Sequence, residues 1–133
     1  MKKAIICIDD ERVILTSLKS QLKRNFGNDF IYEIAENAKE GFDLVEEHTL
    51  AGNKILLIIS DWLMPEMKGD EFFMELNKKH PDIIKILLTG QATNEAIKRA
   101  YNTAGILKCL HKPWEEQYLI DTIQEAMQKL NTD

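Results

Sequence analysis

Apolar and polar positions along the chain form two alternating kinds of pattern. Continuous apolar runs predict five β-strands, at residues 4–8, 30–36, 55–60, 83–89 and 106–111. After each run, apolar residues recur every three or four positions, which predicts helices over residues 11–26, 38–50, 68–80, 93–104 and 115–130. A strand followed by a helix, five times over, is typical of an α/β domain with a parallel sheet between layers of helices.

Charged residues within these runs indicate which strands lie at the edges of the sheet. Glu33 interrupts the second run and Lys108 the fifth, whereas the first and third runs are continuously apolar, as central parallel strands are, and the fourth is nearly so. The flavodoxin-like order 2-1-3-4-5 places the second and fifth strands at the edges. We therefore predict a three-layer αβα, doubly wound, five-stranded parallel sheet in this order.

Composition bounds the domain number, the compartment and the partners. The 133 residues suit one domain, 1–133, which is either a single-domain protein or a part cut from a longer one. The net charge of −5 argues against nucleic acid or an anionic membrane as the main partner. The first apolar run is too short for a signal peptide, and no segment is long enough to span a bilayer, so we expect a cytoplasmic protein. Cys7 and Cys109 lie within apolar runs, which favours free, buried thiols.

Polar residues gather where the predicted strands end. They are Asp9 and Asp10 after the first strand, Asp61 after the third, Thr89 and Gly90 after the fourth, and His111, Lys112 and Pro113 after the fifth. Ligands of doubly wound folds bind outside the carboxyl ends of the strands, at the switch point between strands one and three. Three carboxylates, a hydroxyl and an amine are therefore expected to converge there.

The chemistry of that spot favours a hard divalent cation and phosphoryl transfer. Clustered carboxylates repel one another unless a cation neutralises them. The candidate ligands are oxygens without a His or Cys cluster, which selects Mg²⁺, or Mn²⁺, over Zn²⁺. A carboxylate can accept a phosphoryl group, which needs a metal, a cation and a hydroxyl around it. Mg²⁺, Lys112 and Thr89 meet these needs.

Four segments at the strand ends resemble the receiver domains of bacterial two-component response regulators. They are "IDDE" (8–11), "SDWLMPEMKG" (60–69), "LLTG" (87–90) and "KPW" (112–114), within a resemblance that spans about residues 3–128. The resemblance implies that Asp61 accepts the phosphoryl group and that Thr89 and Lys112 contact it. It also implies a Mg²⁺ site formed by Asp9, Asp10, Asp61 and the backbone carbonyl of Leu63, and a cis Lys112–Pro113 peptide bond.

The same resemblance implies a function and partners. Such a domain is a signalling phosphoacceptor rather than an enzyme, although it promotes its own phosphorylation and dephosphorylation. Its donor is a sensor histidine kinase or a histidine phosphotransfer protein. The fourth helix, fifth strand and fifth helix, about residues 93–130, form its signalling face, through which two copies can pair. Direct binding to nucleic acid or a membrane is not expected.

Some positions depart from the family pattern. Cys109 stands three residues before Lys112, where receivers usually have a Tyr or Phe that moves with the threonine. Coupling to the signalling face is therefore expected to be weaker, unless Tyr101 or Trp114 supplies the ring. Leu63 and Gln91, two residues beyond the acceptor and the threonine, leave the rate of phosphoryl loss open.

Three other readings can be compared with the receiver. A phosphatase of the haloacid dehalogenase type needs a second acid where Leu63 stands, and a flavodoxin-like flavin binder would have hydroxyls and glycines in place of "DDER". A pseudo-receiver, which binds proteins without phosphorylation, remains the alternative. His48, His80 and His111 have no metal-ligand spacing and are expected at the surface or in loops.

Overall fold

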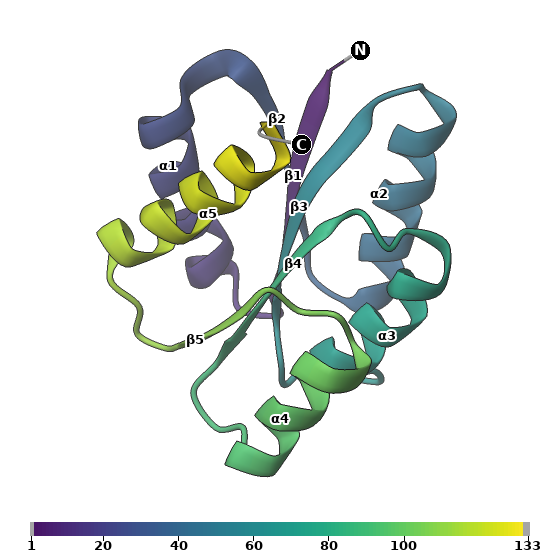
Figure 1. The fold of residues 1–133 in the computed structure, drawn as a ribbon, viewed down its shortest axis with the longest axis vertical. Coiled ribbons are helices and arrows are strands. Elements are labelled where there is room, and N and C mark those ends of the chain that lie inside the picture. Colours follow the sequence, from purple (N-terminus) through teal and green to yellow (C-terminus); the bar gives the residue numbers. More distant parts are fainter. Residues whose placement is uncertain (1, 132–133) are drawn as a thin grey trace.

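The computed structural model describes residues 2–131, in which five strands alternate with five α-helices (Figure 1). The strands are β1 (Lys3–Ile8), β2 (Phe30–Ala35), β3 (Lys54–Asp61), β4 (Ile84–Thr89) and β5 (Lys108–His111). The helices are α1 (Arg12–Phe26), α2 (Ala38–Leu50), α3 (Gly69–Lys79), α4 (Asn94–Thr103) and α5 (Glu116–Asn131). A short 3-10 turn, Gly27–Asp29, joins α1 to β2.

The strands form one parallel sheet in the order β2-β1-β3-β4-β5, which confirms the predicted topology. Glu33 and Lys108 lie on the two edge strands, as expected. β5 begins at Lys108, two residues later than the apolar run suggested. The preceding Ile106 is buried, and Leu107 donates its N–H to the carbonyl of Lys85 at 2.7 Å. The apolar run thus begins before the strand, because Ile106 is buried in the segment that leads into β5.

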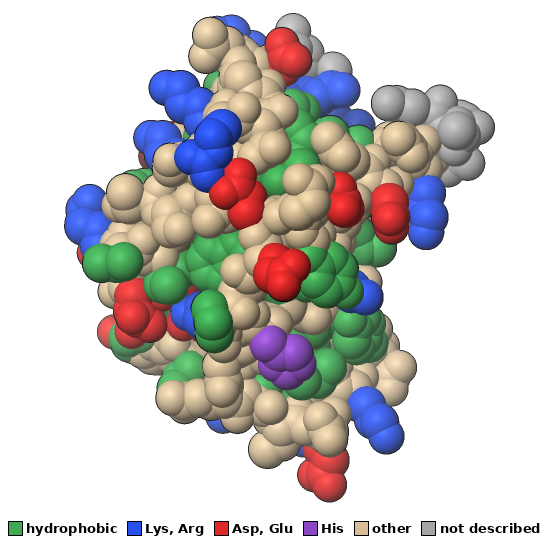
Figure 2. All heavy atoms as spheres, turned by 90° about the vertical axis from the view of Figure 1, so that its left-hand side faces the viewer, with side chains coloured by type: hydrophobic (Ala, Val, Ile, Leu, Met, Phe, Trp, Pro, Cys, Tyr) green, Lys and Arg blue, Asp and Glu red, His purple; other side chains and the backbone are tan. Residues whose placement is uncertain are grey.

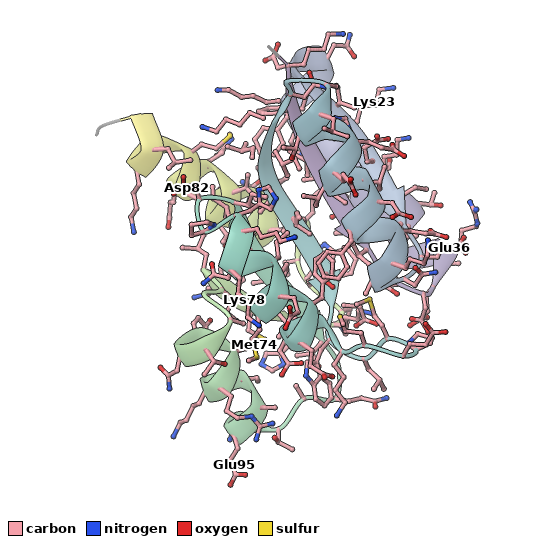
Figure 3. All side chains as sticks on the ribbon, turned by 90° about the vertical axis from the view of Figure 1, so that its right-hand side faces the viewer. Lys23, Glu36, Met74, Lys78, Asp82 and Glu95 are labelled. Atoms are coloured by element: carbon pink, nitrogen blue, oxygen red, sulfur yellow. The ribbon has the colours of Figure 1, made fainter. Side chains whose placement is uncertain are left out.

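Two hydrophobic cores lie on opposite faces of the sheet. α1 and α5 cover one face, and α2, α3 and α4 cover the other (Figures 1 and 3). Alternate residues of β1 divide between them: Ile5 belongs to the core under α1 and α5, and Ile6 to the core under α2 and α3. This division follows from the two-residue period of a strand, and it explains why the central strands are apolar throughout.

His48 corrects one expectation from the sequence, because it is buried rather than at the surface. It lies on α2 three residues after Val45, on the helix face that packs against the sheet. Its Nε2 lies 2.8 Å from Oε2 of Glu33, and its Nδ1 lies 3.1 Å from Nδ2 of Asn53. The pair explains how the edge strand β2 accommodates a glutamate beside a buried helix face.

Within the described residues, no helix is both long enough and apolar enough to cross a membrane.

Candidate functional site

The fold brings the predicted acidic residues together at the carboxyl ends of β1 and β3. These strands are neighbours, and Ile8 pairs with Ser60, so Asp9 and Asp61 follow them side by side. Carboxylate oxygens of Asp9, Asp10 and Asp61 all lie within 4.8 Å of one another. Asp9 and Asp61 are buried, whereas Asp10 is exposed. The cluster therefore has a buried base and an open side.

Lys112 joins this cluster from the end of β5. Its Nζ lies 2.8 Å from Oδ2 of Asp9 and 3.1 Å from Oδ1 of Asp61. Its backbone N–H donates to the carbonyl of Thr89 at 2.9 Å, which holds the end of β5 to that of β4. The peptide bond to Pro113 is cis, which confirms the expectation from the resemblance. One amine therefore bridges two of the three acids.

The electrostatics of the site follow from burial and crowding. Burial, and then the nearby Asp9 carboxylate, raise the pKa of Asp61 to about 6, against the opposing effect of Lys112. Burial lowers the pKa of Lys112, but hydrogen bonds and charge interactions with Asp9 and Asp61 outweigh it and raise that pKa above its ordinary value. At neutral pH the site thus holds an ionised Asp61 carboxylate beside a charged amine.

Asp9 has both carboxylate oxygens engaged. Oδ1 accepts the backbone N–H of Glu11 at 2.8 Å, while Oδ2 contacts the Lys112 amine. Glu11 is the N-cap residue of α1, and its side chain makes no capping hydrogen bond. Asp9 therefore orients the turn between β1 and α1 instead of capping the helix itself.

The segment after Asp61 is fixed by backbone contacts. Trp62 donates its N–H to the carbonyl of Leu88 at 2.8 Å, and its own carbonyl accepts the N–H of Gly69 at 2.7 Å. A Cβ on Gly69 would lie 2.2 Å from the Asp61 carbonyl oxygen, so only glycine fits there. Glu66, within the loop, has a φ of 72°, in the left-handed region.

An open pocket of about 580 Å³ lies over these groups. Its lining includes the predicted residues Asp10, Asp61, Leu63, Thr89, Gly90, Gln91 and Lys112, together with Glu11, Met64 and Pro65. Asp9 does not line the pocket, because it lies beneath it, fully buried. The sequence pattern assigned no role to Glu11, although it belongs to the "IDDE" segment.

Thr89 is buried at the end of β4, and its hydroxyl is already in use. Its Oγ1 accepts the backbone N–H of Gln91 at 3.0 Å and that of Ala92 at 2.8 Å. These bonds hold the loop between β4 and α4 in a tight turn. Thr89 thus connects the floor of the pocket to the start of α4.

The structure distinguishes the two rings that could replace an aromatic at Cys109. Trp114 packs on the core under α1 and α5, and its Nε1 donates to Oε1 of Gln21 at 2.8 Å. Tyr101, on α4, places its hydroxyl 2.9 Å from the backbone nitrogen of Cys109 and accepts that N–H. Tyr101 is therefore the ring that contacts β5 at the position in question. Cys7 is buried and Cys109 half-buried, and both are free thiols.

The donor set fits a hard divalent cation. Ligand oxygens around an octahedral Mg²⁺ lie about 3 to 4 Å apart, close to the 4.8 Å within which the three carboxylates already gather. All three are oxygen donors, and the exposed Asp10 leaves a side open for the water ligands that Mg²⁺ retains. Residues Asp9, Asp10 and Asp61 could therefore hold such an ion.

Comparison with known proteins identifies the family. The model of the response regulator receiver domain matches residues 5–124, and the chain belongs to this family. It is thus a receiver domain of two-component systems, and receiver domains are signalling domains.

Individual relatives agree. The chain is 30% identical over 124 residues, 93% of its length, to the hydrogenase transcriptional regulatory protein HoxA of Cupriavidus necator, of which it spans only 24%. It is 27% identical to a chemotaxis protein CheY homolog of Campylobacter jejuni, with 92% of this chain and 91% of that protein covered. Among solved structures, a CheY-like receiver domain protein of Methanospirillum hungatei superimposes with a TM-score of 0.86 at 29% identity, covering 99% and 98% of the two chains. The chain therefore spans about a quarter of the first relative and nearly all of the second.

Proposed function

We propose that this domain accepts a phosphoryl group on Asp61 from a sensor histidine kinase or a histidine phosphotransfer protein, with Mg²⁺ or Mn²⁺ bound. The observation that supports the proposal most directly is the meeting of Asp61, two further acids and Lys112 at the base of one open pocket. The pocket is open to solvent above Asp61, so a partner's phosphohistidine could approach it there, and the buried carboxylate is ionised at neutral pH.

In the transfer, a carboxylate oxygen of Asp61 attacks the phosphorus of the phosphohistidine. The phosphorus–nitrogen bond breaks, an acyl phosphate forms on Asp61, and the departing imidazole keeps the electron pair and takes a proton from solvent. Lys112, now 3.1 Å from Asp61, is placed to pair with a phosphoryl oxygen, and Thr89 can donate its hydroxyl to another.

Asp9, Asp10, Asp61 and the backbone carbonyl of Leu63 would hold the metal. When bound, Mg²⁺ supplies positive charge that offsets the charge on the phosphoryl oxygens. Leu63 is 46% exposed on the rim, so its carbonyl belongs to a segment that faces the pocket.

The output face in this proposal is formed by α4, β5 and α5. It carries exposed large side chains, among them Tyr101, Tyr118 and, just before β5, Leu107, which suit a contact with a downstream protein or a second copy of the domain. The face formed by α1 and α5 mixes acidic, basic and hydrophobic side chains (Figure 2), without the uniform positive charge that favours nucleic acid. We place the protein in the cytoplasm, as one domain that is either complete or part of a longer regulator.

Intact-mass analysis tests the proposal. The protein is incubated with an acyl phosphate donor and Mg²⁺, with parallel samples of Asp61→Asn, of Asp43→Asn as an exposed carboxylate control, and of wild type with a chelator. Wild type and Asp43→Asn should each gain one phosphoryl group, and the other two samples none. Equal labelling of Asp61→Asn would refute the assignment, and a lack of labelling in every sample would favour the pseudo-receiver.

A further inference from the structure

α4 is attached to the sheet by small side chains. Its buried residues are Ala96 and Ala100, whereas α3 buries two phenylalanines and a leucine. Alanine side chains bury little apolar area, so each contributes less packing free energy than a buried Phe or Leu. Figure 3 places α4 at the end of the molecule, with Glu95 in its first turn pointing away from the other helices. The position of α4 therefore depends strongly on its polar contacts.

One of these contacts joins α4 to the edge of the sheet. β5 lies at the edge of the sheet, and the backbone N–H of Cys109 points outward from it, toward α4. Tyr101 accepts this outward N–H with its hydroxyl at 2.9 Å. The contact, here called the tyrosine clasp, satisfies a backbone donor that an edge strand otherwise presents to solvent or to a partner.

A second contact joins the other end of α4 to the pocket. Thr89 accepts the N–H groups of Gln91 and Ala92, and the helix begins immediately afterwards with Thr93 as its N-cap. A rotation of the Thr89 side chain toward a phosphoryl group on Asp61 would remove its oxygen from both amides. The loop that starts α4 would then lose its two side-chain hydrogen bonds.

We propose that the tyrosine clasp is the conformational switch of this domain: it is closed when Asp61 is unphosphorylated and opens when Asp61 is phosphorylated. The inference rests on the proposed phosphorylation of Asp61. Release of the loop by Thr89 allows α4 to shift on its alanine face, and the shift withdraws Tyr101 from Cys109. The aromatic switch is thus carried by α4 rather than by β5, where the small Cys109 side chain lies half-buried.

Opening of the clasp would change what the output face presents. The hydroxyl of Tyr101 leaves the sheet edge, and the outward N–H of Cys109 becomes available to a hydrogen-bond acceptor from a partner. Both changes occur on β5, between the helices of the proposed output face. Phosphorylation in the pocket would thereby make the backbone N–H of Cys109 available for hydrogen bonding on the output face.

Amide hydrogen exchange measured by NMR tests the closed state first. The variant is Tyr101→Phe, which keeps the ring and removes the hydroxyl. The matched control is Tyr118→Phe, which alters the other exposed tyrosine of the face, whose ring lies under the Lys108 amine. Without ligand, the Cys109 amide should exchange about fivefold faster in Tyr101→Phe than in wild type, the scale of one neutral hydrogen bond. It should keep its wild-type rate in Tyr118→Phe, and equal rates in all three proteins would overturn the clasp.

The second arm tests opening, with beryllofluoride and Mg²⁺ as the phosphoryl mimic. Exchange at Cys109 should rise in wild type and Tyr118→Phe toward the rate of Tyr101→Phe, which should show little further rise. An unchanged rate in wild type, with fluorine NMR showing the mimic bound, would overturn the switch while leaving phosphorylation at Asp61 intact. If wild type neither binds the mimic nor gains a phosphoryl group, the proposed function is refuted, and so is the opening of the clasp on phosphorylation. The exchange rates measured without ligand would still test whether the clasp exists.

Discussion

Replacement of Asp61 by asparagine should stabilise the metal-free domain at pH 8. The buried Asp61 carboxylate, 8% exposed, lies beside Asp9, and its pKa rises from 3.8 to about 6 on folding. This rise means that ionised Asp61 costs the folded state about 3 kcal/mol relative to its neutral form. Asparagine has nearly the same shape without the charge. Asp61→Asn should therefore raise the free energy of unfolding by about 3 kcal/mol, which corresponds to roughly 10 °C in melting temperature.

The pH dependence identifies the cause. Between pH 4 and 6 the folded wild type binds more protons than the unfolded chain, so its stability falls as the pH rises through this range. The advantage of Asp61→Asn should therefore shrink below about 1 kcal/mol at pH 4. Saturating Mg²⁺ should also reduce the difference in stability between the variant and wild type at pH 8, because an ion at the proposed site would bind the folded wild type more tightly than the variant.

Thermal unfolding followed by circular dichroism, at pH 4 and pH 8 with a chelator and at pH 8 with Mg²⁺, measures these differences. Asp43→Asn is the control, since Asp43 forms an exposed pair with Lys39 and should change stability by less than about 0.5 kcal/mol. The idea that ionisation of Asp61 opposes folding would be refuted if Asp61→Asn were no more stable than wild type at pH 8. It would also be refuted if the variant exceeded wild type in stability by the same amount at pH 4 and pH 8.

Three further substitutions, one of them with a matched control, test other parts of the site. Gly69→Ala should lower the free energy of unfolding, measured in urea, by about 3 kcal/mol, because its methyl group would lie 2.2 Å from the Asp61 carbonyl oxygen. Gly90→Ala is the control: its methyl group would have no contact closer than 3.8 Å, and the free energy of unfolding should change by less than about 0.5 kcal/mol. Glu66→Gly should raise it by about 1 kcal/mol, since glycine adopts a φ of 72° without strain; a loss would mean that the glutamate side chain contributes more than the strain costs. Lys112→Met should bind Mg²⁺ about fivefold more tightly by calorimetry, because the amine repels the ion; weaker binding would show that the lysine helps to form the metal site.

The sequence predicted the fold and the location of the site because both depend on regular features. Glu33 and Lys108 marked the edge strands, because a charge within a central strand is costly to bury between two layers of helices. Lys85, in the central strand β4, is an exception to this criterion. The site followed because parallel strands end at one side of the sheet. Asp61, Thr89 and Lys112 therefore converge through topology alone.

Contacts that depend on packing between elements could not be predicted in this way. The clasp requires the rotation of α4 and its height above β5 to bring Tyr101 to Cys109, and no periodicity encodes either quantity. Lys85 is similar. Its amine lies buried in β4 because Nζ donates hydrogen bonds to the backbone carbonyls of His80, at 3.3 Å, and Ile83, at 2.8 Å. Its partners belong to a loop whose path the sequence pattern leaves open.

The bridge between Lys112 and Asp9 also has a consequence for biosynthesis. It joins residues 103 positions apart, so the first and last parts of the domain must both have left the ribosome before it can form. A nascent chain that ends before β5 contains Asp9 and Asp61 but no amine between them, and it lacks the edge strand that carries Lys112. Completion of the acidic site is therefore among the late events of folding during translation. A partly synthesised domain therefore lacks the amine that the proposed phosphoryl transfer to Asp61 would use.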